Sequence, residues 1–289
     1  MKNLFSLLSI ACIVGMMSCT KNDPISQDTT VAQTLLDQSY GTDLQQRMDI
    51  YLPAGRSTSS TKVMIMIHGG GWSLGNKSDF TAFVDTLKRR LPDYAIFNLN
   101  YRLSANPNNL FPTQELDVKA AVEYIYNRLS EYNISNKFVY LGASAGGHLA
   151  MLQGYKYNAP VKAKAIVSFF GPSDLIDMYN NPVGGNPTAP LILANVIGAT
   201  PVQNPALYNN SSPVNFISGS TAMPTILLHG GVDPLVSPTQ SVAVQTKLNA
   251  AGVVNQYVFY PNGGHGDWDA ATYTDAFNKI QAFLTANVQ

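Results

Sequence analysis

Ser144 lies at the centre of Gly142-Ala143-Ser144-Ala145-Gly146, which fits the pattern G-x-S-x-G. An apolar run precedes it and a helical run follows it, so the pattern predicts a sharp strand-to-helix turn. Small residues on both sides let the strand and the helix approach closely, and the turn lifts the serine hydroxyl out of the sheet. Ser144 is therefore a candidate nucleophile, although an ordinary tight turn with an exposed serine has the same pattern.

A second motif, H-G-G-G-W at residues 68–72, follows the apolar run 62–67. Successive glycines let the backbone approach a ligand and leave their N–H groups unblocked. An acyl-transfer enzyme needs two or three such donors around the oxyanion of its tetrahedral intermediate. We expect the N–H groups of Gly70, Gly71 and Ala145 to form this oxyanion hole.

The neighbours of these glycines have predicted roles of their own. His68 is expected to brace the loop by hydrogen bonds, and Trp72 is expected to line the substrate pocket. A flexible loop or a phosphate cradle is the alternative, but a phosphate loop has a Lys-Ser/Thr pair after its glycines, and none follows here.

The composition excludes several classes of protein. The chain has 289 residues, of which 45% are hydrophobic, enough for a sizeable core, and 12% are charged. Its 18 basic and 18 acidic residues balance, so nothing indicates a nucleic-acid partner or an electrostatic membrane patch. Histidines form no H-x-H or H-E-x-x-H cluster. We expect neither a metal nor a cofactor.

The first residues predict export. Lys2 precedes an apolar stretch at 4–17, which has the length of a signal-peptide core. The stretch ends just before Cys19 and resembles a bacterial lipoprotein signal, in which the cysteine becomes lipidated. An ordinary secretory signal is the alternative. We assign residues 1–18 to a signal peptide and 19–32 to a flexible tether, and we expect a membrane-anchored protein of the bacterial cell envelope.

The two cysteines of the chain are Cys12, inside the predicted signal, and Cys19. A mature chain that begins at Cys19 would contain no disulfide, no catalytic thiol and no cysteine metal site.

Residues 33–289 are expected to form one domain of α/β class. Apolar runs alternate with helical patterns, which predicts a mostly parallel sheet with helices on both faces, preceded by an antiparallel edge hairpin at 33–53. The predicted strands are 62–67, 94–99, 138–141, 164–170, 225–228 and 256–260, and the predicted helices are 78–91, 113–133, 145–157, 237–251 and 273–288. An insertion at 174–223, rich in proline and asparagine, is expected to cover part of the site; a packed excursion without a function is the alternative.

Several candidate residues come just after predicted strands, namely His68, Ser144, Asp233 and His265. Ligands of parallel sheets bind at the carboxyl ends of the strands, so we expect these residues to gather at one edge of the sheet.

Five motifs in this order resemble the α/β-hydrolase superfamily. They are H-G-G-G-W at 68–72, N-Y-R-L at 100–103, G-A-S-A-G-G-H at 142–148, H-G-G-V-D at 229–233 and G-G-H-G at 263–266. The resemblance is strongest to the esterase/lipase branch with an H-G-G-G loop, which includes hormone-sensitive-lipase-like enzymes and bacterial feruloyl or acetyl esterases. It implies a serine hydrolase of carboxylic esters, with acetyl or feruloyl esters of polysaccharides among the candidate substrates.

The resemblance also implies a catalytic triad in the chain order Ser144, Asp233, His265. His265 would take the proton from Ser144, and Asp233 would accept a hydrogen bond from His265 and stabilise its charged form. Asp174 and Asp267 remain rival acids for this role.

The other histidines are expected to be structural: His148 points into packing after the elbow, and His229 ends a buried strand. Arg102 and Asp117 are expected to form an internal ion pair that holds the loop behind the site.

Two other functions remain open. The same machinery could cleave amides, as in arylformamidases or peptidases, or the fold could serve binding without catalysis. The sequence leaves the oligomeric state open.

Overall fold

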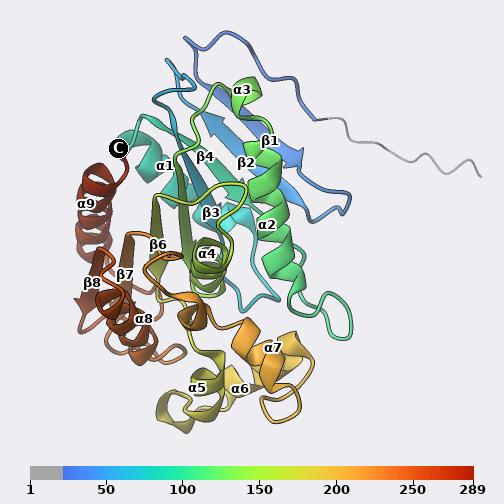
Figure 1. Ribbon diagram of the computed structural model, residues 1–289, viewed down its shortest axis with the longest axis vertical. Helices are drawn as coiled ribbons and strands as arrows, with labels where there is room; N and C mark the ends of the chain where they lie inside the picture. The colour runs from blue at the N-terminus through green and yellow to red at the C-terminus, as the bar shows by residue number, and fades with distance from the viewer. Residues whose placement is uncertain (1–21) are drawn as a thin grey trace, which may run out of the picture.

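The computed structural model describes residues 22–289, which are built around one sheet of eight strands (Figure 1). The strand order is β1-β2-β4-β3-β5-β6-β7-β8. Strands β4, β3 and β5 to β8 run parallel, whereas β1 and β2 form the predicted antiparallel hairpin at one edge. The strands are β1 (Gln33–Ser39), β2 (Arg47–Leu52), β3 (Lys62–Ile67), β4 (Tyr94–Leu99), β5 (Phe138–Ala143), β6 (Ala165–Phe169), β7 (Thr225–Gly230) and β8 (Asn255–Tyr260).

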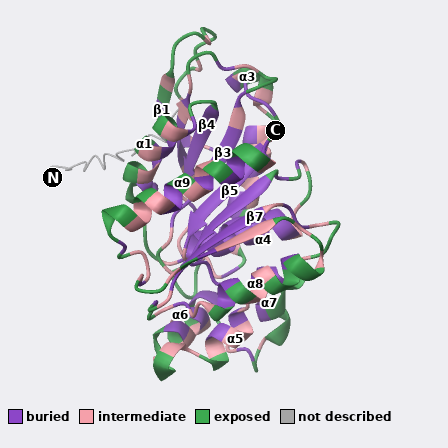
Figure 2. Ribbon diagram, turned by 90° about the vertical axis from the view of Figure 1, so that its left-hand side faces the viewer, coloured by how far each residue is buried: buried purple, intermediate pink, exposed green. Residues whose placement is uncertain are grey.

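Helices cover both faces of the sheet, as the continuous apolar strands predict. In β3, Ile65 and Ile67 face the core cluster that includes α2, α4 and α8, whereas Met64 and Met66 face the cluster that includes α1 and α9. The central strands are accordingly buried throughout (Figure 2). The helices are η1 (Lys77–Phe80), α1 (Thr81–Arg90), α2 (Thr113–Tyr126), α3 (Leu129–Tyr132), α4 (Ala145–Lys156), α5 (Leu175–Asn180), η2 (Val183–Gly185), α6 (Thr188–Ile197), α7 (Pro205–Asn210), η3 (Pro213–Phe216), α8 (Thr239–Ala250) and α9 (Ala270–Asn287).

The single helix predicted over 113–133 is wrong, because the chain leaves the helical conformation at Arg128 (φ −123°, ψ 18°). The short α3 that follows ends at Asn133, whose left-handed conformation (φ 53°, ψ 53°) turns the chain toward β5. The apolar periodicity continues across this break, which is why the sequence pattern does not reveal it.

The insertion at 174–223 contains three α-helices, α5, α6 and α7, and lies at one end of the molecule (Figure 1). It is fastened to α8 at its start. The side-chain oxygen of Gln240, which is buried, accepts hydrogen bonds from the N–H groups of Ser173 and Asp174 at 2.9 and 2.7 Å. We refer to residues 174–223 as the cap.

The sequence predicts a flexible tether at 19–32, but the part of it that the structure describes, residues 22–32, lies against the edge of the sheet. Asn22 exchanges two hydrogen bonds with the backbone of Ser39 in β1, at 2.7 and 2.9 Å. The buried guanidinium of Arg56 donates to the carbonyl groups of Ser26 and Val31. The predicted signal peptide and Cys19 lie outside the described residues. No helix among residues 22–289 is both long and apolar enough to cross a membrane.

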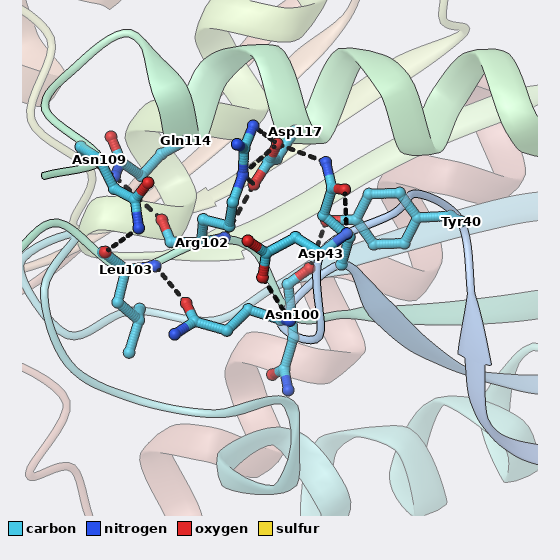
Figure 3. Close-up of polar contacts among 10 residues, drawn as sticks. Tyr40, Asp43, Asn100, Arg102, Leu103, Asn109, Gln114 and Asp117 are labelled. Atoms are coloured by element: carbon cyan, nitrogen blue, oxygen red, sulfur yellow. Dashed lines mark hydrogen bonds and ion pairs between the residues drawn. The ribbon is translucent and has the colours of Figure 1, made fainter. Parts of the chain in front are cut away.

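The loop after β4 is held by the predicted ion pair, which is confirmed (Figure 3). Asp117 of α2 is buried and accepts hydrogen bonds from the backbone N–H of Arg102 at 2.8 Å and from its guanidinium at 2.6 Å. Gln46 donates a further bond to the same carboxylate at 2.8 Å. One carboxylate therefore joins the β1–β2 hairpin, the loop after β4 and helix α2.

We expect Asp117→Ala to lower the free energy of unfolding by about 2–4 kcal/mol, since it leaves several donors without an acceptor. Asp93→Ala is the control, because Asp93 pairs with Lys62 at the surface, and its loss is expected to cost less than about 1 kcal/mol. Urea unfolding of both variants measures the difference. Equal losses would contradict the role of Asp117.

Candidate active site

Ser144 occupies the predicted turn between β5 and α4. Its backbone has φ 54° and ψ −123°, a strained conformation for a residue with a side chain. Two glycines make the turn possible: a Cβ atom on Gly142 would lie 2.2 Å from the carbonyl oxygen of Gly146, and one on Gly146 would lie 1.9 Å from that of Ile67. The N–H of Ser144 donates to the carbonyl of Phe169 in β6.

Three side chains from three loops form a line of hydrogen bonds. His265, after β8, has its Nε2 atom 2.9 Å from Ser144 Oγ. Its Nδ1 atom is 2.7 Å from Oδ2 of Asp233, after β7. The structure therefore brings together the three residues that the sequence nominates as nucleophile, base and acid.

Asp233 is buried and well provided with donors. The N–H groups of Leu235 and Val236 both donate to its Oδ1 atom at 2.9 Å. Burial alone would raise the pKa of Asp233, but bonds from His229 and His265, the charge of His265 and the N–H of Val236 outweigh it, so the pKa lies well below its usual range. The carboxylate stays ionised at neutral pH.

The rival acids have other positions. Asp174 is the N-cap of α5 and accepts hydrogen bonds from the N–H groups of Ile176 and Asp177 at 3.1 and 2.9 Å. Within residues 22–289, no hydrogen bond joins Asp267 to His265. Asp233 is thus the acid in contact with the histidine.

His68 and His229 do not take part in the line from Asp233 to Ser144, although His229 Nε2 also lies 3.4 Å from Asp233 Oδ2. His68 stacks on Tyr101, with ring centres 4.4 Å apart, and its Nδ1 atom lies 2.7 Å from the carbonyl oxygen of Gly69. His229 is buried; its Nδ1 atom lies 2.7 Å from Ser241 Oγ and its Nε2 atom 2.9 Å from the carbonyl oxygen of Val236.

His148 is more than the packing residue expected from sequence. Its Nε2 atom lies 2.7 Å from the carbonyl oxygen of Ser211 in the cap, and its Nδ1 atom accepts a hydrogen bond from the indole N–H of Trp72 at 3.2 Å. Burial lowers the pKa of His148 to about 4.

The glycine loop adjoins the serine. Gly70 and Gly71 have φ values of 106° and 57°, and a Cβ atom on Gly70 would lie 2.2 Å from the carbonyl oxygen of Leu74. Across the described part of the chain, neither N–H donates a hydrogen bond to another protein group. Ala145 is the first residue of α4, where N–H groups lack an intrahelical partner.

A cavity of about 450 Å³ lies between the serine, the glycine loop and the cap. The cap contributes Met178, Ala189 and Ile192, and the core domain contributes Trp72, as expected, and Phe170. The residues that line this cavity include no Asp, Glu, Lys or Arg, so it suits a neutral and largely apolar group.

Phe170 is a site residue that the sequence interpretation missed. It has φ 38°, and its ring lies 4.6 Å from that of His265, tilted by 52°. A bulky residue with positive φ is held there by its surroundings and often marks a functional site. Its position directly after β6, like that of Ser144 after β5, is the signal that could have revealed it.

The mostly parallel sheet with a serine elbow after its central strand, together with the structural likeness reported below, defines an α/β-hydrolase fold. The family profile named BD-FAE matches residues 48–248, and the chain belongs to that family.

Known proteins resemble this chain in sequence and in structure. Esterase LipQ of Mycobacterium tuberculosis is 28% identical over 222 residues, which cover 73% of this chain and 51% of LipQ. This chain spans about half the length of LipQ and of two further curated relatives that it matches.

Two solved structures share the fold. A truncated carbohydrate esterase from gut microbiota has a TM-score of 0.71 and 24% identity, covering 91% of this chain and 100% of its own. A bacterial heroin esterase has a TM-score of 0.74 and 22% identity, covering 91% of this chain and 86% of its own.

Buried His148 is expected to make the folded protein sensitive to acid. An unfolded chain binds a proton on this histidine near pH 6.5, whereas the folded protein binds it only near pH 4. Stability is therefore lost as pH falls through this window. We expect the free energy of unfolding to fall by about 2–3 kcal/mol more in wild type than in His148→Asn between pH 7 and pH 4. Urea unfolding at several pH values measures the free energy of unfolding of both proteins. The same dependence on pH in wild type and His148→Asn would contradict this prediction.

Proposed function

We propose that the protein is a serine-dependent hydrolase of carboxylic esters. The observation that carries this proposal is the line of hydrogen bonds from Asp233 through His265 to Ser144, which opens into the apolar cavity. An intact line of this kind favours an enzyme over a protein that only binds ligands.

The geometry supports a two-step reaction. Ser144 Oγ attacks the ester carbonyl carbon while His265 Nε2 takes the hydroxyl proton, and the charge on His265 is stabilised by Asp233. The N–H groups of Gly70, Gly71 and Ala145 would stabilise the oxyanion. As the intermediate collapses, the C–O bond to the alcohol breaks and His265 returns the proton to the leaving oxygen.

Water completes the turnover. His265 takes a proton from a water molecule, whose oxygen attacks the carbonyl carbon of the acyl-enzyme. The second tetrahedral intermediate collapses, the bond to Ser144 Oγ breaks, and the serine regains its proton from His265. The products are one alcohol and one carboxylic acid.

For the substrate we propose an acetyl or feruloyl ester attached to a polysaccharide. The carbohydrate esterase among the structural neighbours supports a sugar-linked alcohol. The neutral, apolar lining of the cavity supports an uncharged acyl group. Amide cleavage is the alternative that the same residues permit.

We also propose that the protein is exported and anchored through a lipid on Cys19, because an apolar stretch of signal-peptide length precedes this cysteine. Cys19→Ser is expected to move the protein from the membrane fraction to the soluble exported fraction, or to block processing. Mass spectrometry that finds an unmodified mature terminus away from Cys19 would exclude the anchor.

The proposed reaction predicts that Ser144→Ala keeps the fold but loses turnover by roughly 10⁴-fold. Both proteins are assayed on acetylated xylan, feruloylated xylan and short p-nitrophenyl esters, and chromatography measures the acids that are released. Circular dichroism checks that the variant is folded. Release of acid at the wild-type rate by the variant would remove Ser144 from the mechanism. Faster cleavage of matched anilides than of esters would favour the amide alternative.

Two aspartate variants test which carboxylate, Asp233 or Asp174, acts as the acid that orients His265. Asp233→Asn is expected to lower kcat by about 10³–10⁴-fold with little change in KM, because the amide favours the wrong tautomer of His265. Asp174→Asn keeps a side-chain oxygen that can cap α5 and removes only the negative charge at its N-terminus, so we expect a small loss of stability and a kcat within about threefold of wild type. A larger fall in kcat for Asp174→Asn would move the acid assignment to that residue.

A further inference from the structure

The loop that carries Gly70 and Gly71 continues into a third left-handed residue, Trp72, with φ 59°. Glycine accepts such a conformation readily, but a tryptophan does so only when other contacts hold it. Trp72 is buried, with only 2% of the residue exposed. The position of the two glycine N–H groups therefore depends on what holds Trp72.

Two hydrogen bonds hold Trp72, one through its backbone and one through its side chain. Its carbonyl oxygen accepts a bond from the N–H of Ser104 at 2.9 Å, in the loop that Arg102 and Asp117 fasten (Figure 3). Its indole N–H donates to Nδ1 of His148 at 3.2 Å, and the two rings meet edge to face with centres 5.1 Å apart.

His148 can accept this bond only in one tautomer. Its other nitrogen, Nε2, lies 2.7 Å from the carbonyl oxygen of Ser211, so Nε2 carries the proton and Nδ1 is left as an acceptor. The ring is fully buried, and burial keeps it neutral near pH 7. Ser211 thus sets the tautomer that Trp72 requires.

The same residue is also tied to the nucleophile. His148 lies in the first turn of α4, and its N–H donates to the carbonyl of Ser144 at 3.0 Å. One side chain consequently joins the start of α4, the glycine loop and the C-terminal end of α7 in the cap. The sequence predicts only packing for His148, whereas the structure shows a hydrogen bond to Trp72, 76 residues away in the chain.

We propose that His148 and Trp72 are a positioning pair that holds the glycine loop in its oxyanion-binding conformation and couples it to the cap. The proposal rests on the proposed function and concerns how that site is kept in shape. Oxyanion contacts strengthen only in the transition state, so disturbing the pair lowers kcat much more than it raises KM.

The variants follow from the two bonds. Trp72→Phe removes the indole donor but keeps an aromatic ring, and His148→Leu removes both ring nitrogens. His148→Asn keeps a side-chain oxygen near the position of Nδ1. Tyr155→Phe is the matched control, because Tyr155 is a buried residue of the same helix whose hydroxyl is hydrogen-bonded to Thr225, away from the loop.

The measurements are kcat and KM on one short p-nitrophenyl ester at pH 7.5, inhibition by a trifluoromethyl ketone, and melting temperature. The ketone forms a tetrahedral adduct on the serine and so reports on the oxyanion hole. We expect Trp72→Phe and His148→Leu each to lower kcat and ketone affinity by about 10–100-fold, with KM within about threefold. We expect the double variant to be no worse than the more damaging single one, and His148→Asn to lose less than His148→Leu.

Several results would overturn the inference. One is that Trp72→Phe and His148→Leu behave like Tyr155→Phe, with a lower melting temperature and unchanged kcat and ketone affinity. Another is that the fold-losses of the two single variants multiply in the double variant. If His148→Leu does not fold, Trp72→Phe decides alone. A wild-type protein that cleaves no ester contradicts the proposed function as well, whereas an active wild type with unaffected variants contradicts only the positioning pair.

Discussion

A Cβ atom at Gly146 would lie 1.9 Å from the carbonyl oxygen of Ile67, so no side chain fits where α4 begins against β3. This contact lets α4 start directly at Ser144 and fixes the strained backbone of that residue. The glycine loop, Asp233 and His265 lie close to Ser144 because the loops after β3, β7 and β8 begin at the same edge of the sheet. A single close approach of backbone thus determines where the reactive hydroxyl stands.

Charge is confined to one place in this site. Asp233 is buried below His265, where two backbone N–H groups and the neighbouring histidines keep it ionised, while the cavity above is lined by apolar and neutral groups. Such a lining excludes water and strengthens the few dipoles that point into it. The cap completes this lining: a Cβ atom on Gly71 would touch Ile192 of α6 at 3.4 Å. The cap and the glycine loop are therefore parts of one wall.

Much of the fold could be predicted because buried parallel strands have a simple pattern. The six apolar runs became strands nearly at their predicted bounds, and residues in the loops after three of them meet at one edge. What could not be predicted depends on contacts between distant segments. The bond between Trp72 and His148, the left-handed backbone of Phe170 and the arrangement of α5 to α7 leave no periodic signal, because each is fixed by neighbours far along the chain.

The contacts of residues 22–32 limit how far the folded domain could lie from an anchor at Cys19. Asn22 is bound to β1, so a chain anchored at Cys19 would have three residue steps, about 10 Å when extended, before the folded body begins. Such a short link would keep the folded body close to the membrane surface. In Figure 1 the described N-terminal segment lies far from α5 to α7, which border the cavity. In an anchored protein, the cap side of the cavity would therefore lie away from the anchor.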